Sequence, residues 1–111
     1  MSKLAVLGCV TIFGGLLIPK PAAANPLEIQ GTIATVGNVW NADSLQVTLN
    51  TTAVDNGCGG VGSYGTDPSQ PSNHLLQSML LSAYIAGKPV TLVLYGCMGS
   101  TNTIIQVRYG G

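Results

Sequence analysis

Alternation of apolar and polar residues predicts β-strands along much of the chain. Leu45, Val47 and Leu49 alternate with polar residues, which is the pattern of a strand with one buried and one solvated face. Other runs are rich in β-branched residues, which favour strands. The turn-rich segment 96–102 is expected to join the last two strands as an antiparallel hairpin. The predicted strands cover residues 28–36, 45–49, 61–64, 90–95 and 103–109.

A three-and-four spacing of apolar residues predicts one helix between the third and fourth strands. Two prolines within 67–71 resist helical geometry, so the helix is expected to begin after them, capped by Ser72 or Asn73. Gly87 suits the left-handed residue that ends a helix. The apolar stripe expected to face the core consists of Leu75, Leu76, Met79, Leu80 and Ala83.

The element order is three strands, one helix and two strands. This order matches the five-stranded Greek-key barrel with its helix after the third strand, which is the OB-fold. A β-sheet with one helix packed across it would give the same order. We therefore predict an all-β fold with one helix, a small five-stranded OB-fold-like barrel, with the open sheet as the alternative.

The first 24 residues follow a different pattern. A positive start, an apolar stretch over 4–18 and the small residues Ala22–Ala24 have the layout of a secretory signal peptide cleaved near Ala24. The apolar stretch is shorter than the roughly 20 residues that span a bilayer. A lipoprotein modified at Cys9 would have a signal of only about eight residues, which is too short. We expect a single OB-fold-like domain over 25–111, secreted or periplasmic, without membrane insertion.

Charge argues against some partners. The chain has four Lys or Arg and four Asp or Glu, so its formal net charge is zero. It has no basic run of the kind that binds phosphate backbones or an anionic membrane surface. We therefore expect no nucleic-acid partner.

Cys58 and Cys97 remain once the predicted signal peptide is removed. An even pair in an oxidising compartment predicts a disulfide. The bond would stabilise the domain by roughly 3 to 4 kcal/mol in the chain-entropy model. A metal site would need two further ligands, and His74 is the only histidine. We expect neither a metal nor another cofactor.

One polar loop carries the candidate binding residues. Trp40 is the only tryptophan, and Asn38, Asn41 and Asp43 flank it. Sugar sites combine a flat apolar face with amide and carboxylate groups, so these four residues are candidates for glycan binding. The alternative is that Trp40 closes one end of the barrel as part of the core.

No catalytic pattern is evident. The chain lacks a Gly-x-Ser-x-Gly motif, and His74 is expected to be an exposed histidine at the start of the helix. Asp43, Asp55 and Asp67 lie in turn sequences, where an aspartate caps its own backbone. We therefore expect no enzymatic activity.

Residues 58–109 resemble the binding subunits of bacterial AB5 toxins, in particular the subtilase-cytotoxin and pertussis-like type. The resemblance rests on Cys58, the helix 74–86, the run Gly87–Tyr95 and the following Gly96–Cys97. It implies a disulfide-bonded OB-fold, a homopentameric ring whose helices face a central pore, and recognition of host-cell glycans such as sialylated sugars. A catalytic A subunit is a further partner that it implies.

No sugar-contact motif of that family aligns with this chain, so no residue role is carried over. The alternative is a small periplasmic or envelope domain that has a structural or protein-interaction role and binds no carbohydrate.

Overall fold

The computed structural model describes residues 25–60 and 62–109. The predicted signal peptide and its cleavage site lie outside these residues. The described part contains five strands and one helix, in the predicted order. The elements are β2 (Leu27–Asn38), β3 (Leu45–Leu49), β4 (Tyr64–Thr66), α1 (Asn73–Ala86), β5 (Pro89–Met98) and β6 (Thr101–Tyr109).

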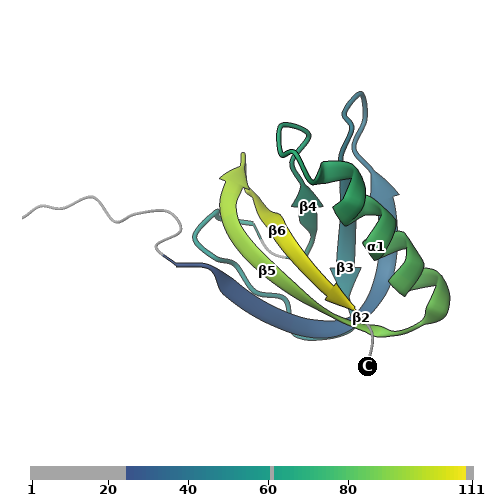
Figure 1. Cartoon of the computed structure of the whole chain (residues 1–111). Coiled ribbons are helices and arrows are strands. Elements are labelled where there is room, and N and C mark those ends of the chain that lie inside the picture. The colour runs from purple at the N-terminus through teal and green to yellow at the C-terminus, as the bar shows by residue number, and fades with distance from the viewer. Residues whose placement is uncertain (1–24, 61, 110–111) are drawn as a thin grey trace, which may run out of the picture.

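The five strands form a closed barrel in the order β2-β3-β4-β6-β5, with β5 returning to β2 (Figure 1). The long β2 makes this closure possible, because its first half pairs with β5 and its second half pairs with β3. The pair β4 and β6 is parallel, and the other pairs are antiparallel. This Greek-key connectivity confirms the OB-fold-like barrel and excludes the open sheet.

The core lies between the barrel strands and α1. Alternate residues of β5 point inward, and α1 covers the barrel by packing against β2 and β6. Tyr64 is the one aromatic residue in this core, and its hydroxyl accepts a hydrogen bond from the Val54 N–H at 3.0 Å. The core residues are Ile33, Leu45, Val47, Tyr64, Leu76, Leu80, Ala83, Val90, Leu92, Leu94, Ile104 and Val107.

The prediction for the third strand was wrong in position. We expected 61–64, whereas β4 begins at Tyr64 and ends at Thr66. Polar contacts fix the strand there. The Thr66 hydroxyl accepts from the Leu45 N–H at 3.0 Å, and the Thr66 carbonyl accepts from the Ser44 hydroxyl at 2.5 Å.

The predicted hairpin between the last two strands is confirmed, but its strands are longer than expected. Pairing continues to Met98 and Thr101, so only Gly99 and Ser100 form the turn. Irregularities in register interrupt the ladder, and Gly96 has a φ of 86° at one of them. The turn-rich composition of this segment therefore reflects a β-bulge as well as a turn.

The helix ends as predicted, at Gly87 with a φ of 67°. Its start differs, because the Ser72 side chain makes no capping hydrogen bond and the Asn73 side chain is used elsewhere. Leu75 was wrongly assigned to the buried stripe, since it is 62 % exposed. None of the described helices has the length and apolar character needed to cross a membrane.

Candidate binding site at the β2–β3 loop

A tight turn connects β2 to β3. The Val39 N–H donates to the Ser44 carbonyl at 3.1 Å, and the Ala42 N–H donates to the Val39 carbonyl at 3.2 Å. Asn41 has a φ of 57°, a left-handed conformation that asparagine tolerates better than most residues. These bonds fix the backbone on both sides of Trp40.

Trp40 lies on this turn with 88 % of its surface exposed. The alternative in which Trp40 plugs the barrel is therefore wrong, because aliphatic side chains and Tyr64 fill the core. An exposed indole is a large apolar surface with a hydrogen-bond donor at its edge, which suits it to contact a ligand or partner. Asn38 and Asn41, its predicted neighbours in the site, are also exposed.

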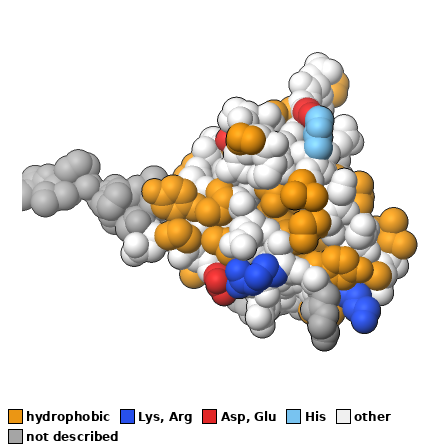
Figure 2. Space-filling view, viewed as in Figure 1, with side chains coloured by type: hydrophobic (Ala, Val, Ile, Leu, Met, Phe, Trp, Pro, Cys, Tyr) orange, Lys and Arg blue, Asp and Glu red, His pale blue; other side chains and the backbone are white. Residues whose placement is uncertain are grey.

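Asp43 ties the turn to the start of α1. Its Oδ2 lies 2.5 Å from the Nε2 of His74, and its Oδ1 accepts from the Gln77 side-chain amide at 2.9 Å. The Asn73 side chain donates to the Asp43 carbonyl at 2.9 Å. We call Asp43, Asn73, His74 and Gln77 the turn clamp, and Figure 2 shows the histidine beside the carboxylate.

The turn clamp corrects one prediction and extends another. The Asp43 carboxylate does not cap its own turn. It bonds to the helix, and the hydrogen bond from Gln77, followed by that from His74, lowers the pKa of Asp43 below its usual value. His74 is exposed, as expected, but it is engaged by Asp43. The clamp is therefore a positioning device for the turn that carries Trp40.

A pocket of about 280 Å³ lies beside this turn. Its walls come from the β2–β3 loop, from β3, from the segment after β4 and from both strands of the β5–β6 hairpin. In OB-folds, oligonucleotides and oligosaccharides bind to the face of the second and third strands and to the loops that follow the first and fourth strands. The corresponding parts of this barrel are β3 with β4, the β2–β3 loop and the β5–β6 turn. We call this pocket the Trp40 pocket after the neighbouring turn, although Trp40 itself does not line it. Its lining residues are Val39, Ala42, Ser44, Gln46, Pro68, Met98 and Thr101.

Sequence reasoning located the loop but missed the pocket. The alternation over 45–49 predicts that Gln46 lies on the solvated face of its strand. This outward position was the one signal in the sequence that Gln46 could line a surface pocket. Pro68, Met98 and Thr101 are distant from the loop in sequence, and only closure of the barrel brings them beside it.

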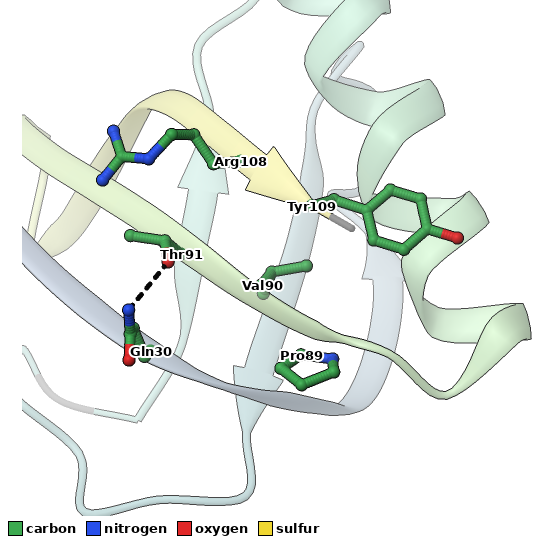
Figure 3. Close-up of a pocket in the computed structure, with 6 residues that line it drawn as sticks. All are labelled: Gln30, Pro89, Val90, Thr91, Arg108 and Tyr109. Carbon is green, nitrogen blue, oxygen red and sulfur yellow. Dashed lines mark hydrogen bonds between the residues drawn. The ribbon is translucent and has the colours of Figure 1, made fainter. Parts of the chain in front are cut away.

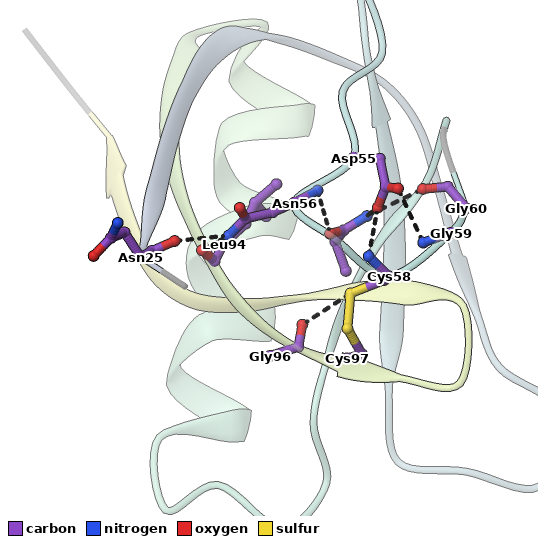
Figure 4. The surroundings of a disulfide bond; sticks show 10 residues. Asn25, Asp55, Asn56, Cys58, Gly59, Gly60, Leu94, Gly96 and Cys97 are labelled. Carbon is purple, nitrogen blue, oxygen red and sulfur yellow. Dashed lines mark hydrogen bonds between the residues drawn. A yellow bond between two sulfur atoms is a disulfide. The ribbon is translucent and has the colours of Figure 1, made fainter. Parts of the chain in front are cut away.

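The predicted disulfide joins Cys58 to Cys97 and holds the long β3–β4 connection against β5 (Figure 4). Next to it, the fully buried Asn102 donates to Asp55 Oδ1 and to the Gly60 carbonyl, both at 3.1 Å, and accepts from the Asn56 N–H at 2.8 Å. We call the disulfide together with these three hydrogen bonds of Asn102 the loop staple. A disulfide of this kind is compatible with a secreted or periplasmic protein.

Asp55 and Asp67 do cap turns. Asp55 accepts from the Cys58 N–H at 2.8 Å and the Gly59 N–H at 2.9 Å, and Asp67 accepts from the Ser69 N–H at 2.9 Å. The hydrogen bond from Cys58, then that from the Asn102 side chain, lowers the pKa of Asp55 below its usual value.

A second depression, of about 390 Å³, lies over the outer face of β2, β5 and β6 (Figure 3). Three of its polar side chains, those of Gln30, Thr91 and Arg108, already have partners. The Gln30 amide donates to the Thr91 hydroxyl at 3.2 Å, and Arg108 forms an ion pair with Glu28 at 2.9 Å. The residues that line it are Gln30, Pro89, Val90, Thr91, Arg108 and Tyr109.

Within residues 25–60 and 62–109, no three His, Cys, Asp or Glu side chains gather in a way that could hold a metal ion. The chain matches no protein-family model, no curated protein and no solved structure.

Proposed function

We propose that this protein is a secreted, non-catalytic carbohydrate-binding module and that it binds glycans at the Trp40 pocket. The observation that carries the proposal is Trp40 itself, an almost fully exposed indole on a hydrogen-bonded turn beside a pocket. A sugar ring presents an apolar face and a rim of hydroxyl groups. An aromatic plane next to hydrogen-bonding side chains is complementary to both.

The module would also assemble as a homo-oligomeric ring, a pentamer by resemblance to the AB5 toxin binding subunits, which would also give it a catalytic A subunit as partner. Support comes from α1, whose outward face is unusually apolar. Leu75 is 62 % exposed and Ile85 is 83 % exposed, and Leu81 lies on the same helix. Figure 2 shows apolar side chains gathered over this helix. Burying such a face between copies would stabilise the small domain.

Glycan binding is tested by screening the oxidised protein on a glycan array and then titrating it with each ligand found. Because Trp40 is the only tryptophan, its fluorescence reports on this site alone. We expect ligands to shift its emission and Trp40→Ala to abolish binding. Tyr95→Ala is the matched control, since Tyr95 is an exposed aromatic residue on β5 that does not line the pocket. An array without a ligand, or binding that survives Trp40→Ala, would contradict the proposal.

Assembly is tested by light scattering of the oxidised protein. We expect about five protomer masses for the wild type and one for Ile85→Lys, because a charge on the apolar face opposes its burial. Tyr95→Lys, which alters an exposed residue outside α1, should leave the mass unchanged. A monomeric wild type would refute the ring.

The same helix face supports a second candidate function, an envelope domain that binds another protein. Strand pairing with a partner is the weaker route, because the described strands close into a barrel. Capture of one defined protein partner that is lost in Ile85→Lys and retained in Trp40→Ala, with no glycan bound, would favour this candidate.

A further inference from the structure

The lining of the Trp40 pocket argues for a particular class of sugar. None of the seven lining residues is charged. The nearest charged residues in sequence are acidic, with Asp43 between Ala42 and Ser44, and Asp67 beside Pro68. The described lysine and arginine residues lie elsewhere, since Lys88 follows α1 and Arg108 pairs with Glu28 on the barrel wall, and His74 is already paired with Asp43. A carboxylate or sulfate on the ligand would therefore find no unpaired lysine, arginine or histidine here and would be repelled by the aspartates.

The walls of the pocket are mainly apolar. Val39, Ala42, Pro68 and Met98 provide hydrocarbon or thioether surface. A sugar that carries only hydroxyl groups would lose hydrogen bonds to water against such walls. A methyl group on the sugar would instead favour binding, because burial of apolar surface contributes about 0.8 kcal/mol per CH₂.

Two polar groups remain available at the pocket. The Ser44 hydroxyl is used, because it donates to the Thr66 carbonyl. Within the described residues, the Gln46 side-chain amide and the Thr101 hydroxyl form no side-chain hydrogen bond. An amide side chain can donate and accept at the same time, which matches the C=O and N–H of another amide.

We infer that the Trp40 pocket binds the acetamido group of a neutral N-acetylhexosamine. This inference rests on the proposed glycan-binding function. The acetyl methyl group contacts the apolar walls, the amide bonds to Gln46, and the sugar ring stays outside the pocket, beside the turn that carries Trp40. The pocket volume of about 280 Å³ lies just below the range of typical ligand sites, roughly 300–1,000 Å³, so the pocket has room for the acetamido group but not for an oligosaccharide.

The first test compares three methyl glycosides by Trp40 fluorescence and by saturation-transfer NMR on the oxidised full protein. They are N-acetylglucosamine, glucose and N-acetylneuraminic acid. We expect the first to bind at least about tenfold more tightly than the second, as one well-placed apolar group gives. We also expect the strongest saturation on its acetyl methyl group. The acidic sugar should bind most weakly, because it carries a carboxylate.

Two variants locate the acetamido group. Ala42→Leu fills the pocket and Gln46→Leu removes its amide, while both leave Trp40 in place. Each should weaken N-acetylglucosamine binding at least about tenfold and reduce the difference in affinity between N-acetylglucosamine and glucose. Ala86→Leu adds the same group at an exposed position at the end of α1 and should have no effect.

Two oligosaccharides then distinguish the source of the sugar. Chitotriose represents β-1,4-linked N-acetylglucosamine polymers, and N-acetyllactosamine represents the ends of glycoprotein chains. Binding of either with the same sensitivity to Ala42→Leu supports the inference.

Equal binding of glucose and N-acetylglucosamine would overturn the inference and leave the proposed glycan binding intact. Tightest binding of the acidic sugar, abolished by Arg108→Gln, would also overturn it and would move the site to the depression on β2, β5 and β6 (Figure 3). If no glycan binds in the array or in these titrations, the proposed function fails together with the inference.

Discussion

The two loops that flank β3 are both held by an aspartate, but in different surroundings. Before β3, the turn clamp fastens the Trp40 turn through exposed groups, with the Asp43 and His74 side chains 54 % and 81 % exposed. After β3, the loop staple fastens residues 50–60 through a disulfide and the fully buried Asn102. Hydrogen bonds that water can replace contribute little to stability, whereas buried ones are costly to break.

The comparison assigns a different task to each loop. The loop staple holds a long irregular segment on a small barrel whose core alone gives a thin margin of stability. The turn clamp holds the turn that carries one exposed aromatic side chain. Changes to the staple should therefore lower the free energy of unfolding, and changes to the clamp should alter Trp40 while the fold persists.

Removal of the disulfide should have the largest effect. The double variant Cys58→Ser, Cys97→Ser frees a loop with a sequence separation of 39 residues. We expect a loss of about 3 to 4 kcal/mol from the free energy of unfolding in the chain-entropy model. Urea denaturation monitored by circular dichroism measures it. An unchanged midpoint would show that the hydrogen bonds around Asn102 hold the loop without the covalent bond.

Asn102→Ala should rank second. The substitution removes three hydrogen bonds and leaves the Gly60 carbonyl and the Asn56 N–H without their partner. Unsatisfied buried groups cost about 1–3 kcal/mol each, and because Gly60 and Asn56 are only partly buried we expect the lower part of the sum, a loss of about 2–4 kcal/mol. Asn50→Ala is the control, because Asn50 is exposed and donates one bond, to Thr32 at 3.0 Å, so it should cost less than about 1 kcal/mol. Equal losses would mean that burial of Asn102 does not matter.

Gly60→Ala tests how closely the stapled loop approaches the β5–β6 hairpin. A Cβ at residue 60 would lie 2.3 Å from the Ser100 carbonyl oxygen, so the backbone must move. We expect a cost of about 1–3 kcal/mol, as for overpacking. Gly37→Ala has nothing within 4 Å of its added Cβ and should be neutral in the same denaturation experiment. A neutral Gly60→Ala would show that the loop is loosely held.

Features that depend on residues close together in the sequence were predictable, whereas features that depend on contacts between distant residues were not. The alternation over 45–49 gave β3 its bounds, and Gly87 marked the end of α1, because both signals are local. The disulfide was predictable because removal of the predicted signal peptide leaves only two cysteines, Cys58 and Cys97. Leu75 was misassigned because helical spacing identifies an apolar face without showing whether anything covers it.

The site itself was only partly predictable. The polar residues around Trp40 indicated a binding loop. The chain has few aromatic residues to fill a core, however, and this favoured the alternative in which Trp40 is buried at one end of the barrel. The turn itself was signalled by its polar composition, but whether the indole points into the barrel or toward solvent is not encoded in that composition. The pairing of Asp43 with His74 joins residues 31 positions apart and depends on how α1 packs on the barrel.

Acid should loosen the stapled loop through Asp55. Its pKa is lowered in the folded protein, mainly by the Cys58 N–H, so its ionised form stabilises the fold above about pH 4. This stabilisation is lost as the pH falls through the folded pKa. Urea midpoints measured between pH 6 and pH 2 should fall more steeply for the wild type than for Asp55→Asn, which has no carboxyl group to protonate. Parallel curves would exclude Asp55 as a source of acid sensitivity.

Loss of the turn clamp should have the smallest effect on stability and a distinct effect on Trp40. Asp43→Ala removes the acceptor for His74 and Gln77, all at the surface, so the urea midpoint should change little. The turn keeps its own two backbone bonds and the bond from the Asn73 side chain to the carbonyl of residue 43, but it loses the carboxylate that bonds to His74 and Gln77 on α1. We expect the fluorescence anisotropy of Trp40 to decay faster, and glycan affinity to fall, because a mobile aromatic surface must be ordered on binding. Asp67→Ala, whose carboxylate bonds only to Ser69 in its own loop, is the control and should leave the anisotropy unchanged. An unchanged decay in Asp43→Ala would mean that the backbone turn and the bond from Asn73 position Trp40 without the carboxylate, and the distinction between a stabilising staple and a positioning clamp would then fail.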